Sequence, residues 1–188
     1  MLINPYVFEL QPRWLEIGRG ISQIIHTPIA GSYNFSQCGM IFHKDQLGPI
    51  EGRRVTAISL FLSGFEPYFV TNQTVRVAHT TADEFPTGID VYFSDIPVGD
   101  QIAVKDDFSI EMKDGWLRVD IDFIYNGRDN ILIAWENRMG NWEPRFGFLD
   151  GTDKERCLTT VWRADHCYPD GTASNYLYAQ PNIIFHYI

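Results

Sequence analysis

The sequence predicts an all-β fold in which eight to ten short strands form an antiparallel sandwich or barrel. Segments with the periodicity of strands recur along the chain, and clusters of Gly, Pro, Asn and Asp separate them. Aromatic residues make up 14% of the 188 residues, and strands favour aromatic side chains. Helix signals are limited to two single turns, at 44–48 and 81–85. We therefore expect less than about one residue in ten in α-helix.

The clearest pair of strands lies between residues 116 and 136. From Trp116 to Ile124, apolar residues alternate with charged ones, which predicts a strand with one solvent-exposed face. Residues 126–130, "NGRDN", have the composition of a turn. Residues 131–136, "ILIAWE", are apolar on both faces as far as the final glutamate, so we expect a central strand that is covered on both sides. Trp116 and Trp135 lie within these strands, and we expect both in the core.

The remaining predicted strands follow from similar runs. The stronger ones are at 54–63, 74–79, 157–162 and 181–188, and the weaker ones are at 20–29, 37–42 and 91–96. Hydrophobic residues make up 45% of the chain and charged residues 21%, which is typical of a folded globular protein. Because no linker, repeat or low-complexity segment interrupts the chain, we expect one domain at 17–188, preceded by an N-terminal arm at 1–16.

Charge and composition argue against two classes of partner. The formal net charge is −9 and the longest basic run is Arg53-Arg54, whereas a nucleic-acid interface needs a concentrated basic face. No stretch approaches the roughly 18 apolar residues of a transmembrane helix, so we expect no membrane insertion. The first residues also lack the basic and apolar regions of a secretion signal.

The three cysteines, Cys38, Cys157 and Cys167, are too few for a disulfide framework. Cys157 and Cys167 could pair across a loop, but we expect three free thiols. Free thiols indicate synthesis in a reducing cytoplasm.

Six segments spread over about residues 17–188 resemble a known family. They are "IGRG", "YNFSQCGMIFHKDQLG", "RVTAISLFLSG", "VRVAHTTADEF", "GWLRVDIDFIYNGRDNILIAWEN" and "PNIIFHYI". Their order resembles a jelly-roll β-sandwich module of secreted and surface proteins of Bacteroidetes-type bacteria. The resemblance implies a jelly roll of adhesion or carbohydrate-binding type and carries no catalytic motif. Such modules usually accompany a secretion signal and neighbouring domains, and since neither is found here we do not expect ordinary secretion.

Candidate catalytic and metal-binding residues are few. His79, with Thr80, Thr81 and Asp83, could be a general base or a metal ligand, but the spacing favours a turn capped by threonine. Residues 150–155, "DGTDKE", could offer oxygen ligands to calcium, although a solvated turn is the favoured alternative. Nothing marks an activated serine. We therefore expect no metal, no cofactor and no enzymatic activity.

Aromatic residues in loops are the candidate ligand-binding residues. The candidates are Trp142 with Asn141 in "RMGNWEP", Tyr68 in "GFEPYF" and Tyr168 in "HCYPDG". Loops at the end of a sandwich commonly carry recognition, and tryptophan is enriched in binding hot spots. Alternatively, these side chains fold back over the end of their own sandwich.

The N-terminal arm carries large apolar residues, among them Tyr6, Phe8 and Trp14, with few charges. A solvated tail would be polar, so we expect the arm to dock. It could cover its own sandwich or attach to another chain, and we favour attachment by addition of a strand to a sheet edge.

The predicted function is that of a non-enzymatic structural or adhesion protein. We expect a virion component, such as a capsid decoration, head-fibre or tail-appendage protein, of a phage that infects Bacteroidetes-type bacteria. Such a protein is made in the host cytoplasm and assembles with capsid or tail proteins or with copies of itself. The alternative is a carbohydrate-binding module of a bacterial surface glycan-processing system, at the cell surface or secreted, with a cell-surface glycan as its ligand.

Overall fold

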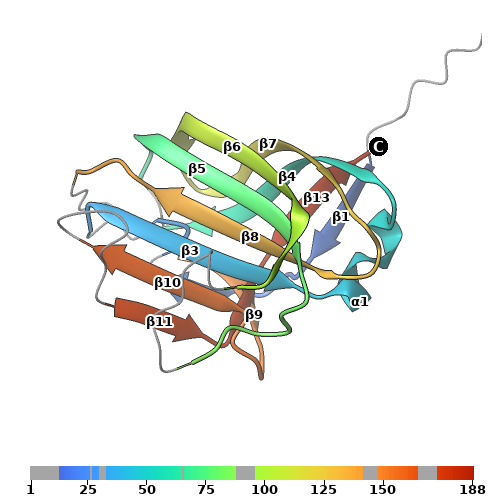
Figure 1. Ribbon diagram of the computed structural model, residues 1–188. Coiled ribbons are helices and arrows are strands. Elements are labelled where there is room, and N and C mark those ends of the chain that lie inside the picture. Colours follow the sequence, from blue (N-terminus) through green and yellow to red (C-terminus); the bar gives the residue numbers. More distant parts are fainter. Residues whose placement is uncertain are drawn as a thin grey trace, which may run out of the picture.

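Two antiparallel β-sheets pack against each other in the computed structural model (Figure 1), which confirms the predicted all-β sandwich. The structure describes residues 13–25, 27–29, 33–64, 66–87, 96–141, 148–164 and 173–188.

The first sheet contains seven of the described strands. They are β1 (Arg13–Ile17), β2 (Ser22–Ile25), β4 (Arg54–Ser63), β7 (Gly115–Ile124), β9 (Phe148–Asp153), β12 (Ala179–Pro181) and β13 (Ile183–Tyr187). β4 is central, because Leu60 lies opposite Ile183 of β13 on one side and Leu117 of β7 on the other. β1 adds to the outer edge of β13, and β9 continues along β4 from Leu62 before pairing with β2 and β12.

The second sheet contains six described strands, in the order β11-β10-β3-β8-β5-β6. They are β3 (Phe35–Phe42), β5 (Tyr68–Thr80), β6 (Val98–Met112), β8 (Asn130–Asn137), β10 (Thr159–Ala164) and β11 (Ala173–Leu177). A single helical turn, α1 (Lys44–Leu47), and the 3-10 turn η1 (Gly48–Ile50) follow β3. Every residue of β8 is buried, as the apolar run at 131–136 predicts.

The core lies between the sheets and is built from the inward-facing residues of both. Phe42 of β3 meets Phe185 of β13 edge to face, with ring centroids 5.6 Å apart, so this contact joins the two layers. Trp135 is fully buried, as predicted, and its indole N–H donates to Gln73 Oε1 at 2.8 Å. Gln73 Nε2 donates in turn to Asn137 Oδ1 at 2.7 Å, so the polar atoms of this buried group have partners.

Glu136 ends the apolar run of β8, yet its side chain is also buried. It forms ion pairs with Arg76 and with Arg138, the latter at 2.6 Å. Two guanidinium groups thus offset the cost of burying one carboxylate.

The described strands number thirteen rather than the eight to ten that the sequence predicts. β9 has the sequence "FLDGTD", which has the composition of a turn. β6 contains "KDD" near its middle and pairs irregularly with β5, so apolar and polar residues do not alternate regularly along it. The predicted strand at 181–188 is divided at Asn182 into β12 and β13. The helical turn predicted at 44–48 is confirmed as α1, whereas the one predicted at 81–85 is not helical. Residues 91–95 of another predicted strand lie outside the described residues.

Strand β1 changes the predicted boundary of the domain. Arg13 to Ile17 pair with Tyr187 to Ile183 of β13, so a boundary placed after residue 16 falls inside a strand of the sandwich. Residues 13–16 therefore cover the protein's own sheet edge, and residues 1–12 of the arm lie outside the described residues.

Two further findings concern the thiols and the helices. Cys38 and Cys157 are buried free cysteines, and Cys167 lies outside the described residues. Burial raises the pKa of both thiols. Among the described residues, no helix is long and apolar enough to cross a membrane.

Candidate functional site

The outer face of the first sheet, the face turned away from the core, carries an unusual set of side chains. Inward-facing residues of β7 such as Leu117, Val119 and Phe123 are buried in the core, so the alternate residues point outward. Trp116 is among these outward residues and is 42% exposed. On β1, Trp14 points outward in the same way and is 68% exposed. Large exposed indoles on a sheet face are typical of surfaces that bind something.

A depression of about 220 Å³ lies at one end of this face. We call it the aromatic groove, and it is lined by Glu16, Gly18, Arg19, Gly20, Ile21, Phe61, Trp116, Asp150 and Asn182. These residues come from both ends of the chain and from its middle, and the pairing of β1, β13, β4 and β7 brings them together.

Two aromatic rings form one side of the aromatic groove. Phe61 of β4 lies directly opposite Trp116 of β7, and their ring centroids are 5.1 Å apart at an angle of 75°. This edge-to-face contact orients the indole while leaving much of it exposed. The groove therefore presents an indole that is held in place before any ligand arrives.

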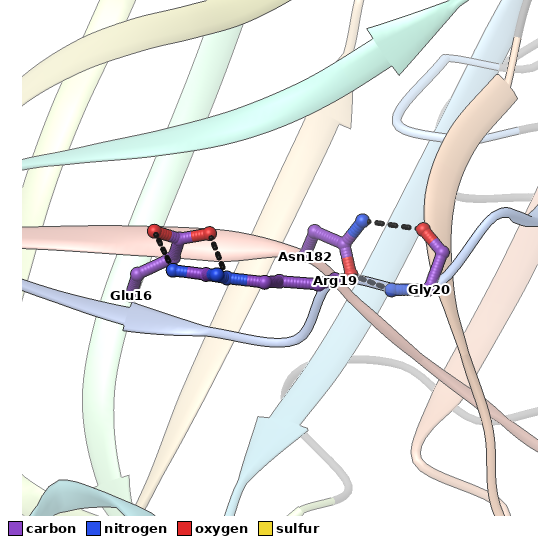
Figure 2. A network of polar contacts seen from close by, with 4 residues as sticks. All are labelled: Glu16, Arg19, Gly20 and Asn182. Carbon is purple, nitrogen blue, oxygen red and sulfur yellow. Dashed lines mark hydrogen bonds and ion pairs between the residues drawn. The ribbon is translucent and has the colours of Figure 1, made fainter.

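Asn182 also lines the groove, and Figure 2 shows its side-chain amide bonded to Gly20. Its side-chain oxygen accepts from the Gly20 N–H at 3.1 Å, and its side-chain nitrogen donates to the Gly20 carbonyl at 2.8 Å. The backbone in this loop needs glycine. Gly18 has φ +82°, and a Cβ at Gly20 would overlap the carbonyl oxygen of Gly151. The loop between β1 and β2 is thus fixed by one buried amide.

The charged side chains Glu16, Arg19 and Asp150 of the aromatic groove form hydrogen bonds with neighbouring residues. Arg19 donates to Glu16 through Nε at 3.0 Å and through a terminal nitrogen at 3.3 Å, a two-point ion pair that Figure 2 shows beside Asn182. Asp150 accepts from the Ser63 hydroxyl at 2.6 Å. The groove therefore combines one exposed indole with a buried amide that is held in place and a more exposed guanidinium–carboxylate pair.

A second ion pair lies farther along the same face. Arg118 Nε is 3.0 Å from Asp120 Oδ1, and both side chains are largely exposed. Because Glu16 offsets Arg19 and Asp120 offsets Arg118, these four charges add no net charge to the outer face. Exposed pairs contribute little to stability, so their main effect here is on the character of the surface.

A serine and a histidine also meet on this face. Ser59 Oγ lies 2.9 Å from His186 Nε2, within the reach expected of a nucleophile and its base. Burial lowers the pKa of His186. Ser59 is nevertheless 3% exposed and sits in the middle of β4, opposite Ile184 and Arg118, where its backbone belongs to the sheet ladder. Acyl transfer needs backbone or side-chain donors directed at the substrate oxygen, and a ladder position does not offer its N–H for that role.

The residues predicted as ligand-binding do not gather at one place among the described residues. Trp142 and Tyr168 lie outside the described residues, whereas Asn141 is exposed in the loop after β8. Tyr68 is not an exposed loop residue as expected: it is 6% exposed at the start of β5 and packs in the core. Of the arm residues, Tyr6 and Phe8 lie outside the described residues, and Trp14 is on β1 of the outer face.

The expectation that Trp116 belongs to the core is wrong. Trp116 shares the spacing of Arg118, Asp120 and Asp122, and all four point away from the core. The alternation in "GWLRVDIDF" contained this information, because residues two apart on a strand lie on the same face. Sequence reasoning also missed Phe61, since strand β4 is apolar at almost every position.

His79 lies near the end of β5, packs against aromatic rings of the core, and lines a separate hollow of about 120 Å³. Its ring lies 4.5 Å from that of Phe123, its Nε2 accepts from the Asn126 N–H at 3.0 Å, and burial lowers its pKa. Thr80 Oγ1 accepts from the Ala82 N–H at 3.0 Å, so a threonine does stabilise a turn here, but the turn is not the helical, capping-box type that the spacing predicts. Within the described ranges, no group of three His, Cys, Asp or Glu side chains is arranged to hold a metal ion.

A scan against protein-family models, a search of curated proteins and a search of solved structures found no match for this chain. The resemblance to bacterial surface modules therefore remains a prediction from the sequence.

Proposed function

We propose that this protein is a non-enzymatic adhesion protein of jelly-roll type that binds carbohydrate through the aromatic groove. The observation that carries the proposal is the exposed, pre-oriented indole of Trp116 facing a side of the groove built from Arg19, Glu16 and Asn182. Ligand sites commonly combine apolar contact with a few fixed polar groups, which is the composition found here.

Sugars match this composition for two reasons. A pyranose ring has a face of C–H groups that can lie on an indole, and a rim of hydroxyl groups that both donate and accept hydrogen bonds. Guanidinium groups donate, carboxylates accept, and amides do both, so the groups around Trp116 can serve such a rim. Because the charges of Arg19 and Glu16 offset each other and Asp150 adds one negative charge, the groove suits a neutral ligand better than an anionic one.

Retention by polysaccharides during native electrophoresis tests this proposal. Gels containing soluble derivatives of cellulose, xylan, mannan or starch should slow the wild-type protein in at least one case. Trp116→Ala should lose the retention, because removing a central aromatic contact commonly weakens binding by about tenfold or more. Phe69→Ala is the matched control, since Phe69 is an aromatic residue 72% exposed on the other sheet. The polysaccharide should also be recovered uncleaved.

Unretarded migration of the wild-type protein in every gel would remove the basis for carbohydrate binding. Equal loss of retention in Trp116→Ala and Phe69→Ala would show that the aromatic groove is not the site.

A second candidate is assembly into a virion, which the sequence predicts and which one feature of the second sheet favours. β6 is the edge strand of that sheet, and Val98, Ile102 and Val104 on it are exposed. Exposed apolar residues along a sheet edge suit contact with another protein. An adhesion protein on a phage particle would use this edge for assembly and the aromatic groove for the host surface.

Assembly is tested by the mass of the protein in solution and by deletion of the part of the arm that precedes β1. Removing residues 1–12 leaves the pairing of β1 with β13 intact, whereas a deletion through residue 16 would remove most of a strand. If residues 1–12 attach the protein to a particle, the truncated protein should fold and fail to incorporate. Normal incorporation of the truncated protein would contradict the attachment role.

A further inference from the structure

We propose that the carbohydrate is an extended chain that crosses the outer face diagonally, from Trp116 in the aromatic groove to Trp14 on β1. This inference rests on the proposed function and adds the length and path of the ligand. It starts from the observation that two exposed indoles occupy the same face of one sheet.

Strand pairing places the two indoles at opposite corners of this face. Trp14 lies opposite His186, and His186 lies opposite Ala57 of β4. Trp116 lies opposite Phe61, which is also on β4. The two tryptophans are therefore three strands apart across the sheet and about four residues apart along it. With strand spacings near 4.8 Å and a rise near 3.3 Å per residue, their Cα atoms are roughly 20 Å apart. A single sugar cannot reach both indoles, whereas a chain of several sugars can.

The surface between the indoles suits a neutral chain. The diagonal from Trp14 to Trp116 passes His186 and the partly buried Ile184 on β13, and then Ser59 and Phe61 on β4. Polar groups border this path, among them the Glu16–Arg19 pair on one side and the Arg118–Asp120 pair on the other. Because the two charges of each ion pair offset each other, the path offers apolar contacts together with hydrogen-bonding groups, including the Ser59–His186 pair, and it carries little net charge. A strongly acidic or basic partner would lack a complementary charge here.

Trp14 is exposed although its position does not require tryptophan for folding. Trp14 lies on an edge strand, where its 68% exposed side chain contributes little to the core. Its neighbours Leu15 and Ile17 supply the inward contacts of β1, since both pack with the core cluster. Replacement of Trp14 should therefore change the outer face and leave the sandwich folded.

Calorimetric titration with fragments of increasing length tests the inference. The fragments are made from the polysaccharide that retains the wild-type protein, and they range from a single sugar to a chain of six. Affinity should rise with length until the fragment spans both indoles. Trp14→Ala should leave the shortest fragments unchanged and weaken the longest by about tenfold, as expected for loss of one aromatic contact. Trp14→Phe should recover part of the loss, and Phe69→Ala should behave as wild type.

Three other outcomes would overturn the inference, and each can be told apart from the others. If affinity is complete with one or two sugars, or if Trp14→Ala matches wild type at every length, the ligand is short and stays within the aromatic groove, while the proposed function stands. If Trp14→Ala instead changes the mass of the protein in solution and not its affinity, Trp14 contacts a second copy of the chain. If no fragment binds the wild-type protein, the proposed function fails together with the inference.

Discussion

Replacing Asn182 with alanine tests how the aromatic groove is built. Asn182 is 5% exposed and forms two hydrogen bonds with Gly20, 162 positions away in the sequence. Its own backbone bonds, from its N–H to Asp150 and from Phe61 N–H to its carbonyl, do not depend on the side chain. Asn182→Ala should therefore leave strand pairing intact and release the loop between β1 and β2.

The expected cost follows from the bonds that are lost. A typical hydrogen bond contributes about 1 kcal/mol net, and the partly buried N–H and carbonyl of Gly20 lose their partner together. We expect the free energy of unfolding to fall by about 2 kcal/mol. For a domain of this size, that change corresponds to a decrease in melting temperature of roughly 4–8 °C.

Thermal and urea denaturation measure this change, and Asn141→Ala is the matched control. Asn141 is an exposed loop residue, so its replacement should alter stability by less than about 0.5 kcal/mol. Asn182→Ala should also weaken retention by polysaccharide, because the loop that carries Arg19 is no longer held. If Asn182→Ala has the same melting temperature as Asn141→Ala, the Asn182 amide does not support the groove and the reasoning is refuted.

Two further predictions concern pH and metal. Burial lowers the folded-state pKa of His79 and of His186 below the ordinary value near 6.5, so protons bind more readily to the unfolded chain. The stability that this difference provides is present above pH 6.5 and is lost as the pH falls through that value toward the folded-state pKa. Urea denaturation between pH 7.5 and 5 should detect the loss. A free energy of unfolding that does not change over this range would contradict the prediction. Chelation with EDTA should change neither the melting temperature nor carbohydrate binding. The segment "DGTDKE" (150–155) runs along β9, with Asp150 in the aromatic groove, and does not curl around a single point where an ion could bind. A fall in melting temperature of several degrees with EDTA, reversed by calcium, would contradict this prediction.

Much of the fold could be predicted because it depends on local patterns. The alternation in β7 and the continuous apolar run of β8 each indicate burial directly, and the structure matches both. Strands that carry charges and irregular pairing, such as β6, could not be recognised in this way. Their place in the sheet comes from pairing with β5 and not from their own periodicity.

The candidate site was harder to predict, because its parts are distant in sequence. The spacing of Trp116 with Arg118 and Asp120 indicates an outward position, so this residue could have been recognised from the alternation alone. The contact of Ser59 with His186, or of Asn182 with Gly20, joins residues more than a hundred positions apart. Only the arrangement of β1, β13 and β4 brings them together, and no local pattern encodes it.

The indole N–H signals of the five tryptophans offer the most direct test of carbohydrate binding at the aromatic groove. In a two-dimensional NMR spectrum each tryptophan gives its own signal, and single replacements assign them. Addition of an oligosaccharide from the retaining polysaccharide should shift Trp116 and, with a long chain, Trp14. Trp135 and Trp162 are fully buried and should stay in place, which makes them internal controls. Shifts confined to Trp142, in the loop that the sequence singles out, or no shift at all, would contradict binding at the aromatic groove.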